Sequence, residues 1–112
     1  MGGRKRYIEY EIPVTALHLA EAIIRDYPRR RQVIKYSAAD DDKVIINYKT
    51  LNETIDSIIA DFDPTFSKII MNDIIERRGY DASIASSFSS RNTYYLHRKK
   101  IIQDICKALF II

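Results

Sequence analysis

The longest regular pattern of apolar positions lies in the middle of the chain, in "KVIINYKTLNETIDSIIADF". Apolar and aromatic residues recur there at steps of four and three, namely Val44, Tyr48, Leu51, Ile55, Ile58 and Phe62. This spacing places them along one side of a helix, so we predict a long amphipathic helix over residues 43–62. A competing signal is Thr50 followed by Glu53, a capping-box pattern that would start the helix later and leave residues 44–48 extended.

A first helix is predicted in "PVTALHLAEAIIRDYP", where Pro13 suits a first helical turn. Its inward positions step by three and four, namely Leu17, Ala20, Ile24 and Tyr27. We expect this helix to end before Pro28 and consider "RRRQVIK" a candidate for its restart. Upstream, "RYIEYEI" alternates apolar and polar residues, which fits either a short strand or a helical extension, and we favour the helix.

Two breaks divide the rest of the chain. The segment "SAADDDK" is small and acidic, so residues 37–42 are predicted to be a linker whose aspartates cap the next helix. Asp63 followed by Pro64 predicts another helix start. The helical period then continues to Arg78, and Gly79 is predicted to end the helix with a left-handed cap.

The last fifty residues hold a third pattern. A short apolar segment, "ASIASSF", is predicted to form a helix of about seven residues, and Ser90 caps a final helix after a tight connection. This layout is typical of a helix-turn-helix unit. We therefore expect an all-α fold, one small domain over residues 1–112 with about five helices. Its parts are a basic N-terminal helical segment (1–36), the acidic linker (37–42), the long central helix (43–62) and the helix-turn-helix DNA-binding unit (64–112).

At about 100° per residue, the last helix has two different sides. The inner side carries Tyr94, Ile101, Ile105, Ala108 and Leu109, with Ile102 at its edge. The outer side, called the outer stripe below, carries Asn92, Tyr95, Leu96, Lys99 and Gln103, flanked by Arg91, Thr93 and Lys100. Arg98 falls in the inner sector, so it would extend out to a phosphate or pair with an acidic residue on a neighbouring helix.

The outer stripe suits DNA. Asn, Gln, Arg and Lys match base edges, and hydroxyls at a helix N-terminus suit phosphate. The 22 residues between Asp81 and Asp104 contain no carboxylate. A merely solvated basic face is the plain alternative, but Tyr95 and Leu96 are unusual on such a face. The residues predicted to bind DNA are Ser90, Arg91, Asn92, Thr93, Tyr95, Leu96, Arg98, Lys99, Lys100 and Gln103.

Charge is distributed unevenly along the chain. The net charge is +3, but residues 1–36 carry eight basic and four acidic residues, residues 37–64 two and seven, and residues 65–112 eight and four. The two basic parts could bind a polyanion while the acidic part faces solvent or a protein partner. Neutralisation of one part by another within the fold explains the same numbers equally well.

Composition excludes several classes of protein. With three Gly and three Pro in 112 residues, the chain has few turn formers, which favours helices. No apolar run approaches the roughly 18 residues of a membrane span, and "MGGRKRYIEY" lacks the apolar stretch of a signal peptide. We expect a soluble, cytoplasmic protein that contacts no membrane.

The sequence offers no chemistry typical of an enzyme. One cysteine, Cys106, and two histidines, His18 and His97, form no zinc pattern, and Cys106 is expected to be buried on an apolar helix face. There is no Gly-rich phosphate loop and no Ser-His or Cys-His arrangement. The aspartates at 40–42 are more simply caps. We expect no enzymatic activity, no cofactor and no bound metal.

The segment "SIASSFSSRNTYYLHRKKIIQDICKAL" resembles the C-terminal helix-turn-helix of phage late-gene transcriptional regulators of the RinA and ArpU type, which is similar to region four of sigma factors. The residues that carry the resemblance are Ile84, Ala85, Phe88, Ser90, Thr93, Tyr94, Tyr95, Arg98, Lys99, Lys100, Ile101, Ile105 and Leu109. Asp26, Tyr27 and Pro28 resemble an N-terminal stretch of the RinA-like members. Ala85 and Ser90 are five positions apart, one fewer than in that pattern.

This resemblance implies a non-enzymatic activator in a bacterial host cell. It would bind double-stranded promoter DNA in late-gene or packaging control and contact RNA polymerase or a sigma factor. Since small DNA-binding proteins commonly dimerise, we expect a homodimer through the Val44–Phe62 stripe, with an intramolecular core as the alternative use of that stripe. The competing functions are a protein-interaction module and a packaging module similar to a small terminase subunit.

Overall fold

The computed structural model describes residues 12–38 and 41–111. They form five α-helices: α2 (Val14–Arg25), α3 (Tyr27–Tyr36), α4 (Lys43–Ile59), α5 (Pro64–Ile75) and α6 (Arg91–Ala108). Two short 3-10 elements, η1 (Tyr80–Ala82) and η2 (Ile84–Ser87), lie between α5 and α6. These residues contain no strand, so the all-α prediction is confirmed. The predicted helical extension in "RYIEYEI" lies outside the described residues, apart from Ile12.

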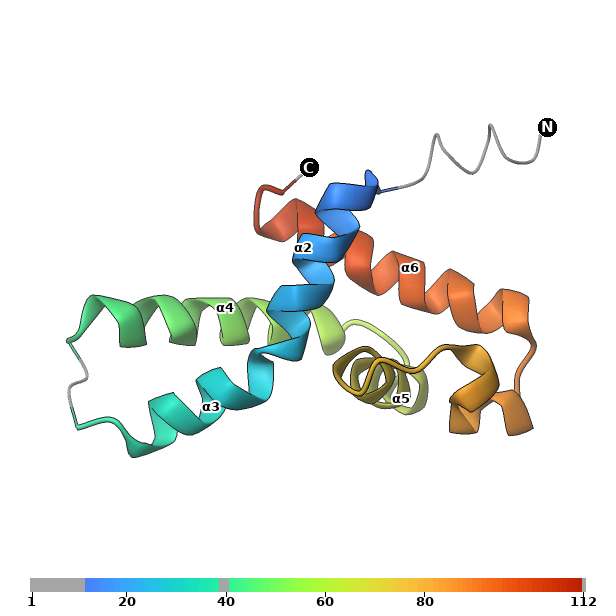
Figure 1. Ribbon diagram of the computed structural model, residues 1–112, viewed down its shortest axis with the longest axis horizontal. Coiled ribbons are helices and arrows are strands. Elements are labelled where there is room, and N and C mark those ends of the chain that lie inside the picture. Colours follow the sequence, from blue (N-terminus) through green and yellow to red (C-terminus); the bar gives the residue numbers. More distant parts are fainter. Residues whose placement is uncertain (1–11, 39–40, 112) are drawn as a thin grey trace.

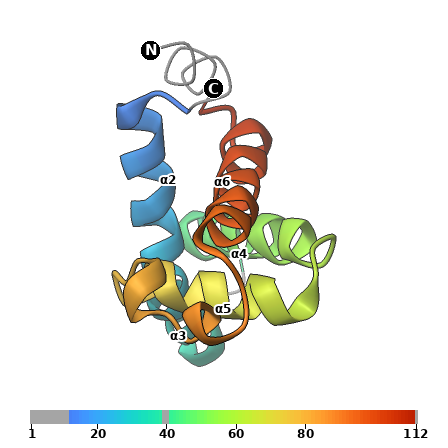
Figure 2. The ribbon, with the colours of Figure 1, turned by 90° about the vertical axis from the view of Figure 1, so that its right-hand side faces the viewer.

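The helices form two parts, which are joined by α2 and by contacts between α4 and α6. Helices α3 and α4 pack side by side as a hairpin at one end of the molecule, and α5, the 3-10 elements and α6 form the other end (Figure 1). Helix α2 contacts α5 and α6, and Figure 2 shows α2 and α6 side by side above α5. The described chain is elongated, with extents of 52 × 30 × 22 Å.

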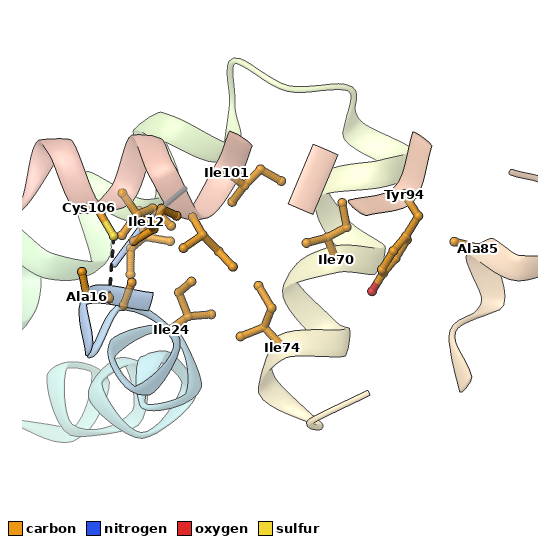
Figure 3. Packing of buried hydrophobic residues seen from close by; sticks show 13 residues of the cluster. Ile12, Ala16, Ile24, Ile70, Ile74, Ala85, Tyr94, Ile101 and Cys106 are labelled. Carbon is orange, nitrogen blue, oxygen red and sulfur yellow. Dashed lines mark hydrogen bonds between the residues drawn. The ribbon is translucent and has the colours of Figure 1, made fainter. Parts of the chain in front are cut away.

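The core lies where α2, α4, α5 and α6 meet. Its fully buried side chains include Ile24, Ile55, Ile70 and Tyr94, and Figure 3 shows the residues of α2, α5 and α6 facing one another. The predicted inner side of α6 is confirmed for Tyr94, Ile101 and Ile105, whereas Ala108 is exposed.

Cys106 is fully buried, as expected from the sequence. Its thiol donates a long hydrogen bond, 3.8 Å, to the carbonyl oxygen of Ala16 in α2 (Figure 3). Burial raises the pKa of the Cys106 thiol, since the thiolate would lose its hydration. The thiol therefore contributes to packing between α2 and α6.

Helices α4 and α5 begin at the capping residues that were predicted from the sequence. Asp42 Oδ1 accepts a hydrogen bond from the N–H of Val44 at 2.7 Å, and α4 begins at Lys43. Asp63 Oδ1 accepts one from the N–H of Phe66 at 3.0 Å, with Pro64 in the first turn of α5. Such caps satisfy backbone donors that have no partner within the helix. The restart at "RRRQVIK" is also confirmed, as α3.

The Val44–Phe62 stripe packs in part against the core of the same chain. Ile55 of the stripe is fully buried, whereas the other buried positions of α4, Ile45 and Asn52, each follow a stripe residue by one position, and Val44 is 52% exposed. This part of the stripe therefore has the intramolecular use, with Ile58 and Phe62 packed against the core, and the homodimer through the Val44–Phe62 stripe stays a prediction. The late start at Thr50 is wrong, since Thr50 lies inside α4.

The end of α5 differs from the prediction. The helix ends at Ile75, and the left-handed residue is Arg77, with φ 60°, whereas Gly79 has φ −98°. The N–H of Arg78 bonds the carbonyl oxygen of Asp73 at 2.7 Å, as in a Schellman motif. A left-handed conformation costs a residue other than glycine roughly 1–2 kcal/mol. This backbone bond and the ion pair between the Asp73 and Arg78 side chains fix the turn here, not the glycine.

The predicted seven-residue helix in "ASIASSF" is wrong, since the segment forms η1 and η2. Serine side chains bond the local backbone: Ser83 Oγ accepts from the N–H of Ala85 at 3.1 Å, and Ser86 Oγ donates to the carbonyl oxygen of Ser83 at 2.8 Å. Such bonds compete with the α-helical pattern and favour tight turns. The C-terminal unit is thus a helix, two 3-10 turns and a helix.

Two tyrosines, the fully buried Tyr94 and the partly buried Tyr27, predict alkaline sensitivity of the fold. Burial and hydrogen bonds donated to Asp56 and Asp73 raise the pKa values of Tyr27 and Tyr94 to about 12, from 10.0. The unfolded chain would lose these protons first, so their contribution to stability is complete below pH 10 and falls as the pH rises toward 12. Urea unfolding between pH 9 and 11.5 should show this loss. The double variant Tyr27→Phe/Tyr94→Phe should show a shallower pH dependence, and an equal one would contradict the assignment.

Candidate nucleic-acid interface

Helix α6 is held in place by a polar network at its inner side. The hydroxyl of Tyr94, which is fully buried, donates to Asp73 Oδ2 at 2.6 Å. Asp73 is 2% exposed and also accepts from Arg78 Nε at 3.1 Å. Arg98 Nη1 donates to the Tyr94 hydroxyl at 2.9 Å and to the Arg78 carbonyl oxygen at 2.7 Å. Because every partner is fixed by another, the network sets the rotation of α6.

The start of α6 is capped and charged. Ser90 Oγ accepts from the N–H of Thr93 at 3.1 Å and donates to Thr93 Oγ1 at 3.0 Å. Arg91 forms an ion pair with Asp81, and its guanidinium lies 5.1 Å from the centre of the Tyr80 ring. Both members of the ion pair are largely exposed. Ser90 thus positions the helix, and Asp81 partly neutralises the charge of Arg91.

The outer stripe does lie at the surface. Leu96 is 68% exposed, and Asn92, Thr93 and Lys100 are also exposed, along the helix that leads away from the 3-10 turns (Figure 1). Lys99 and Gln103 are half-buried, and both have interactions within the protein. The division of α6 into an inner and an outer side is therefore correct at both Tyr94 and Leu96.

Arg98 faces inward, unlike the other predicted DNA contacts. Its side chain is 14% exposed, and Nη2 lies 3.7 Å from Glu21 Oε2 in α2. Of the two arrangements expected from its angle on the helix, the structure has the pairing with an acidic residue on a neighbouring helix. Since its donors bind Glu21, Tyr94 and the backbone, we assign Arg98 a structural role and withdraw it from the predicted interface.

Tyr95 lies on the outer side but leans back onto the chain. It is 39% exposed, its hydroxyl accepts a hydrogen bond from the N–H of Tyr80 at 3.1 Å, and its ring meets that of Tyr94 edge-on. A Cβ at Gly79 would lie 3.0 Å from this hydroxyl, so the glycine leaves room for it. Tyr95 therefore braces the connection that follows α5, which sequence spacing does not reveal.

This arrangement predicts that Tyr95→Phe lowers the free energy of unfolding by about 0.5–1.5 kcal/mol, the usual net contribution of one hydrogen bond. The Tyr80 N–H would lose its acceptor while the ring packing stays. Chemical denaturation measures the change, and Leu96→Ala is the matched neighbour, expected to have little effect on stability because its side chain is largely exposed. Equal stability of Tyr95→Phe and the parent protein would rule out the brace.

Several residues that support the interface were not identified from the sequence. Asp73, Arg78 and Tyr80 support α6 from outside it, and Tyr80 donates a short hydrogen bond to the carbonyl oxygen of Ser89. His97 stacks on Phe66, with ring centres 4.3 Å apart, and so has a packing role. For Asp73 the sequence offers one signal. Its position in the helical period of α5, in line with apolar residues, could have indicated that its carboxylate faces the core.

Among the described residues there is no helix that is both long and apolar enough to cross a membrane. In the same part of the chain, no three His, Cys, Asp or Glu side chains come together as metal ligands. A scan against models of known protein families matched none of them, and searches of curated proteins and of solved structures found no similar chain.

Proposed function

We propose that the chain is a sequence-specific DNA-binding protein that inserts the N-terminal half of α6 into the major groove. One observation carries the proposal: an outer stripe without carboxylates, exposed at Asn92, Tyr95 and Leu96, lies opposite the buried residues Tyr94, Ile101 and Ile105 of the same helix. A helix that reads DNA must be held rigidly on its opposite side. Tyr94 supplies that support through its hydrogen bond to Asp73. The basic charge of residues 65–112 suits approach to phosphate.

The proposed contacts divide by chemistry. Asn92, Lys99 and Gln103 have side chains that can recognise base edges, and Leu96 suits apolar contact with a thymine methyl group. Arg91, Thr93 and Lys100 lie at the flank and suit backbone phosphates. Ser90 and Tyr95 act mainly by positioning α6 and the connection before it, through the hydrogen bonds described above.

The biological setting that we propose is transcription regulation of the phage late-gene type, as an activator in a bacterial cell. It rests on the sequence resemblance in the helix-turn-helix segment. Contact with RNA polymerase or a sigma factor would then be a second activity of the same chain. The acidic part of the sequence, residues 37–64, includes α4, whose start lies at the end of the α3–α4 hairpin farthest from the N-terminus of α6 (Figure 1), and this end offers a separate surface for a protein partner.

Fluorescence anisotropy with duplex DNA at several salt concentrations tests DNA binding. With about five phosphate contacts, the logarithm of the affinity should fall with the logarithm of the salt concentration at a slope near −4 to −5. Ligands selected from a random duplex library supply the preferred site. Absence of salt-sensitive binding to any duplex would refute the proposal.

Single variants separate recognition from positioning. Asn92→Ala should weaken binding to the selected site by about 1–3 kcal/mol and leave random DNA unaffected. Lys100→Ala should weaken both equally. Lys107→Ala is the control, because it removes one exposed cation from the other end of α6. Equal losses for Asn92→Ala on both ligands would mean that the stripe positions the protein without reading sequence.

A second candidate is a protein-interaction or packaging module that uses the same helices. It is favoured by three apolar side chains in the η2–α6 region that are at least half exposed, Ile84 at 68%, Phe88 at 51% and Leu96 at 68%. Exposed apolar surface of this kind often marks a protein contact. Binding of DNA with the expected salt dependence would favour the first function.

A further inference from the structure

A second cationic surface adjoins the outer stripe at Tyr95 and Lys99, in a cleft between α2, the connection after α5 and α6. The cleft has a volume of about 480 Å³, and its charged lining residues are Glu21, Arg25, Arg77, Arg78, Arg98 and Lys99. They come from three distant parts of the sequence. Tertiary packing has thus gathered five cations and one carboxylate around one concave space.

Among the described residues, the carboxylates that pair with these cations offset only part of their charge. Glu21 serves both Arg25 and Arg98, at 3.8 and 3.7 Å, which are too long for strong hydrogen bonds. Asp73 pairs with Arg78 at 3.1 Å. Even with Asp73 counted, the cations of the cleft exceed the carboxylates by three. Concave surfaces with excess charge of one sign concentrate ligands of the opposite sign.

Arg77 is the member that points to a ligand. It holds a left-handed backbone conformation, φ 60°, at a position where helices usually place glycine. Its side chain is exposed and has no hydrogen-bond or ion-pair partner among the described residues. The glycine two positions later adopts an extended conformation instead. Arg77 therefore lies at the edge of a cationic cleft with an unfavourable backbone conformation and a guanidinium that has no partner among the described residues. Backbone strain of this kind tends to occur at functional sites.

We propose that this cleft binds a phosphate-bearing ligand, with Arg77 as a direct contact and Arg25 and Lys99 beside it. Guanidinium groups suit phosphate because their N–H donors match pairs of phosphate oxygens. The ligand is two or more linked phosphates, from either a free polyphosphate or the backbone of bound DNA. The inference goes beyond recognition by the outer stripe, because it needs no base sequence and its direct contact, Arg77, lies outside α6. Lys99 is the one contact that the two proposals share.

The test uses the full chain, with pyrophosphate and duplex DNA as separate probes. Arg77→Gly is the informative variant, because glycine adopts the left-handed conformation without strain and the fold should persist, as circular dichroism would verify. Calorimetry should show pyrophosphate binding by the parent protein and a loss of at least about tenfold in Arg77→Gly. Arg31→Ala is the charge-matched control, since Arg31 is exposed on α3 outside the cleft, and it should bind like the parent.

The outcomes separate the two phosphate sources and the two proposals. Binding of pyrophosphate that depends on Arg77 supports a site for a free polyphosphate, even if the protein fails to bind DNA. A tenfold loss of DNA affinity in Arg77→Gly, without pyrophosphate binding, supports contact with the DNA backbone. If neither ligand distinguishes Arg77→Gly from Arg31→Ala, the phosphate site is refuted, while salt-dependent DNA binding through the outer stripe would still stand.

Discussion

Asp73→Ala is expected to lower the free energy of unfolding by about 3 kcal/mol, among the largest losses for one polar side chain in this protein. The substitution leaves the fully buried hydroxyl of Tyr94 without its acceptor and removes the partner of Arg78. Each stranded polar group costs about 1–3 kcal/mol when water cannot replace the partner. Urea denaturation, followed by circular dichroism, measures the change.

The control for this variant is Asp81→Ala. Asp81 also pairs with an arginine, Arg91, but both side chains are largely exposed. Exposed ion pairs contribute little, so this variant should remain close to the parent protein. If the two alanine variants were equally stable, the network behind α6 would not be what fixes the helix.

Arg30→Met is expected to lower the free energy of unfolding by about 2–3 kcal/mol and to loosen one part of the fold in particular. The Arg30 side chain is 3% exposed and connects three helices. Nε donates to Asn52 Oδ1 in α4 at 2.8 Å, and Nη2 donates to the carbonyl oxygen of Ile23 in α2 at 2.6 Å. Methionine keeps much of the apolar stem but has no donors, so a buried amide and a carbonyl lose their partners.

Hydrogen exchange would locate this effect. Amide protons of α3 and of the first half of α4 should exchange faster in Arg30→Met, while those of α5 and α6 keep their protection. Arg31→Met is the adjacent control, because Arg31 is exposed on the same helix, whereas Arg29 also bonds Tyr48 of α4. Uniform acceleration throughout the chain, or none, would contradict the view that Arg30 holds the hairpin.

Helix positions followed from local chemistry wherever a cap and a period agreed. Asp42 and Asp63 each bond a backbone N–H at the predicted place, because capping depends on residues two or three positions apart. The helix predicted in "ASIASSF" was wrong for a local reason too, since the serine side chains of this segment bond the nearby backbone. The left-handed cap was predicted at Gly79 but lies at Arg77. The turn is fixed by the pairing of Asp73 with Arg78 and by the bond that Arg98 of α6 donates to the carbonyl oxygen of Arg78.

The candidate site was predictable only in part. A 100° step per residue separated Tyr94 from the exposed Leu96 correctly. It also placed Arg98 among apolar positions, but the partner, Glu21, lies in a helix 77 positions earlier in the chain. The buried Arg30 was not recognisable, since charged residues are rarely buried and its partners belong to other helices. Likewise, the residues of the cationic cleft come together only in the folded chain.

The projecting α3–α4 hairpin also determines how the molecule moves through a solvent or a gel. The described chain has a radius of gyration of 15.3 Å, whereas a compact domain of 100 residues would have about 13 Å and one of 200 residues about 16 Å. A single copy should therefore elute from a sizing column where a compact protein of about one and a half times its mass elutes. Mass from light scattering, which does not depend on shape, will distinguish one copy from two.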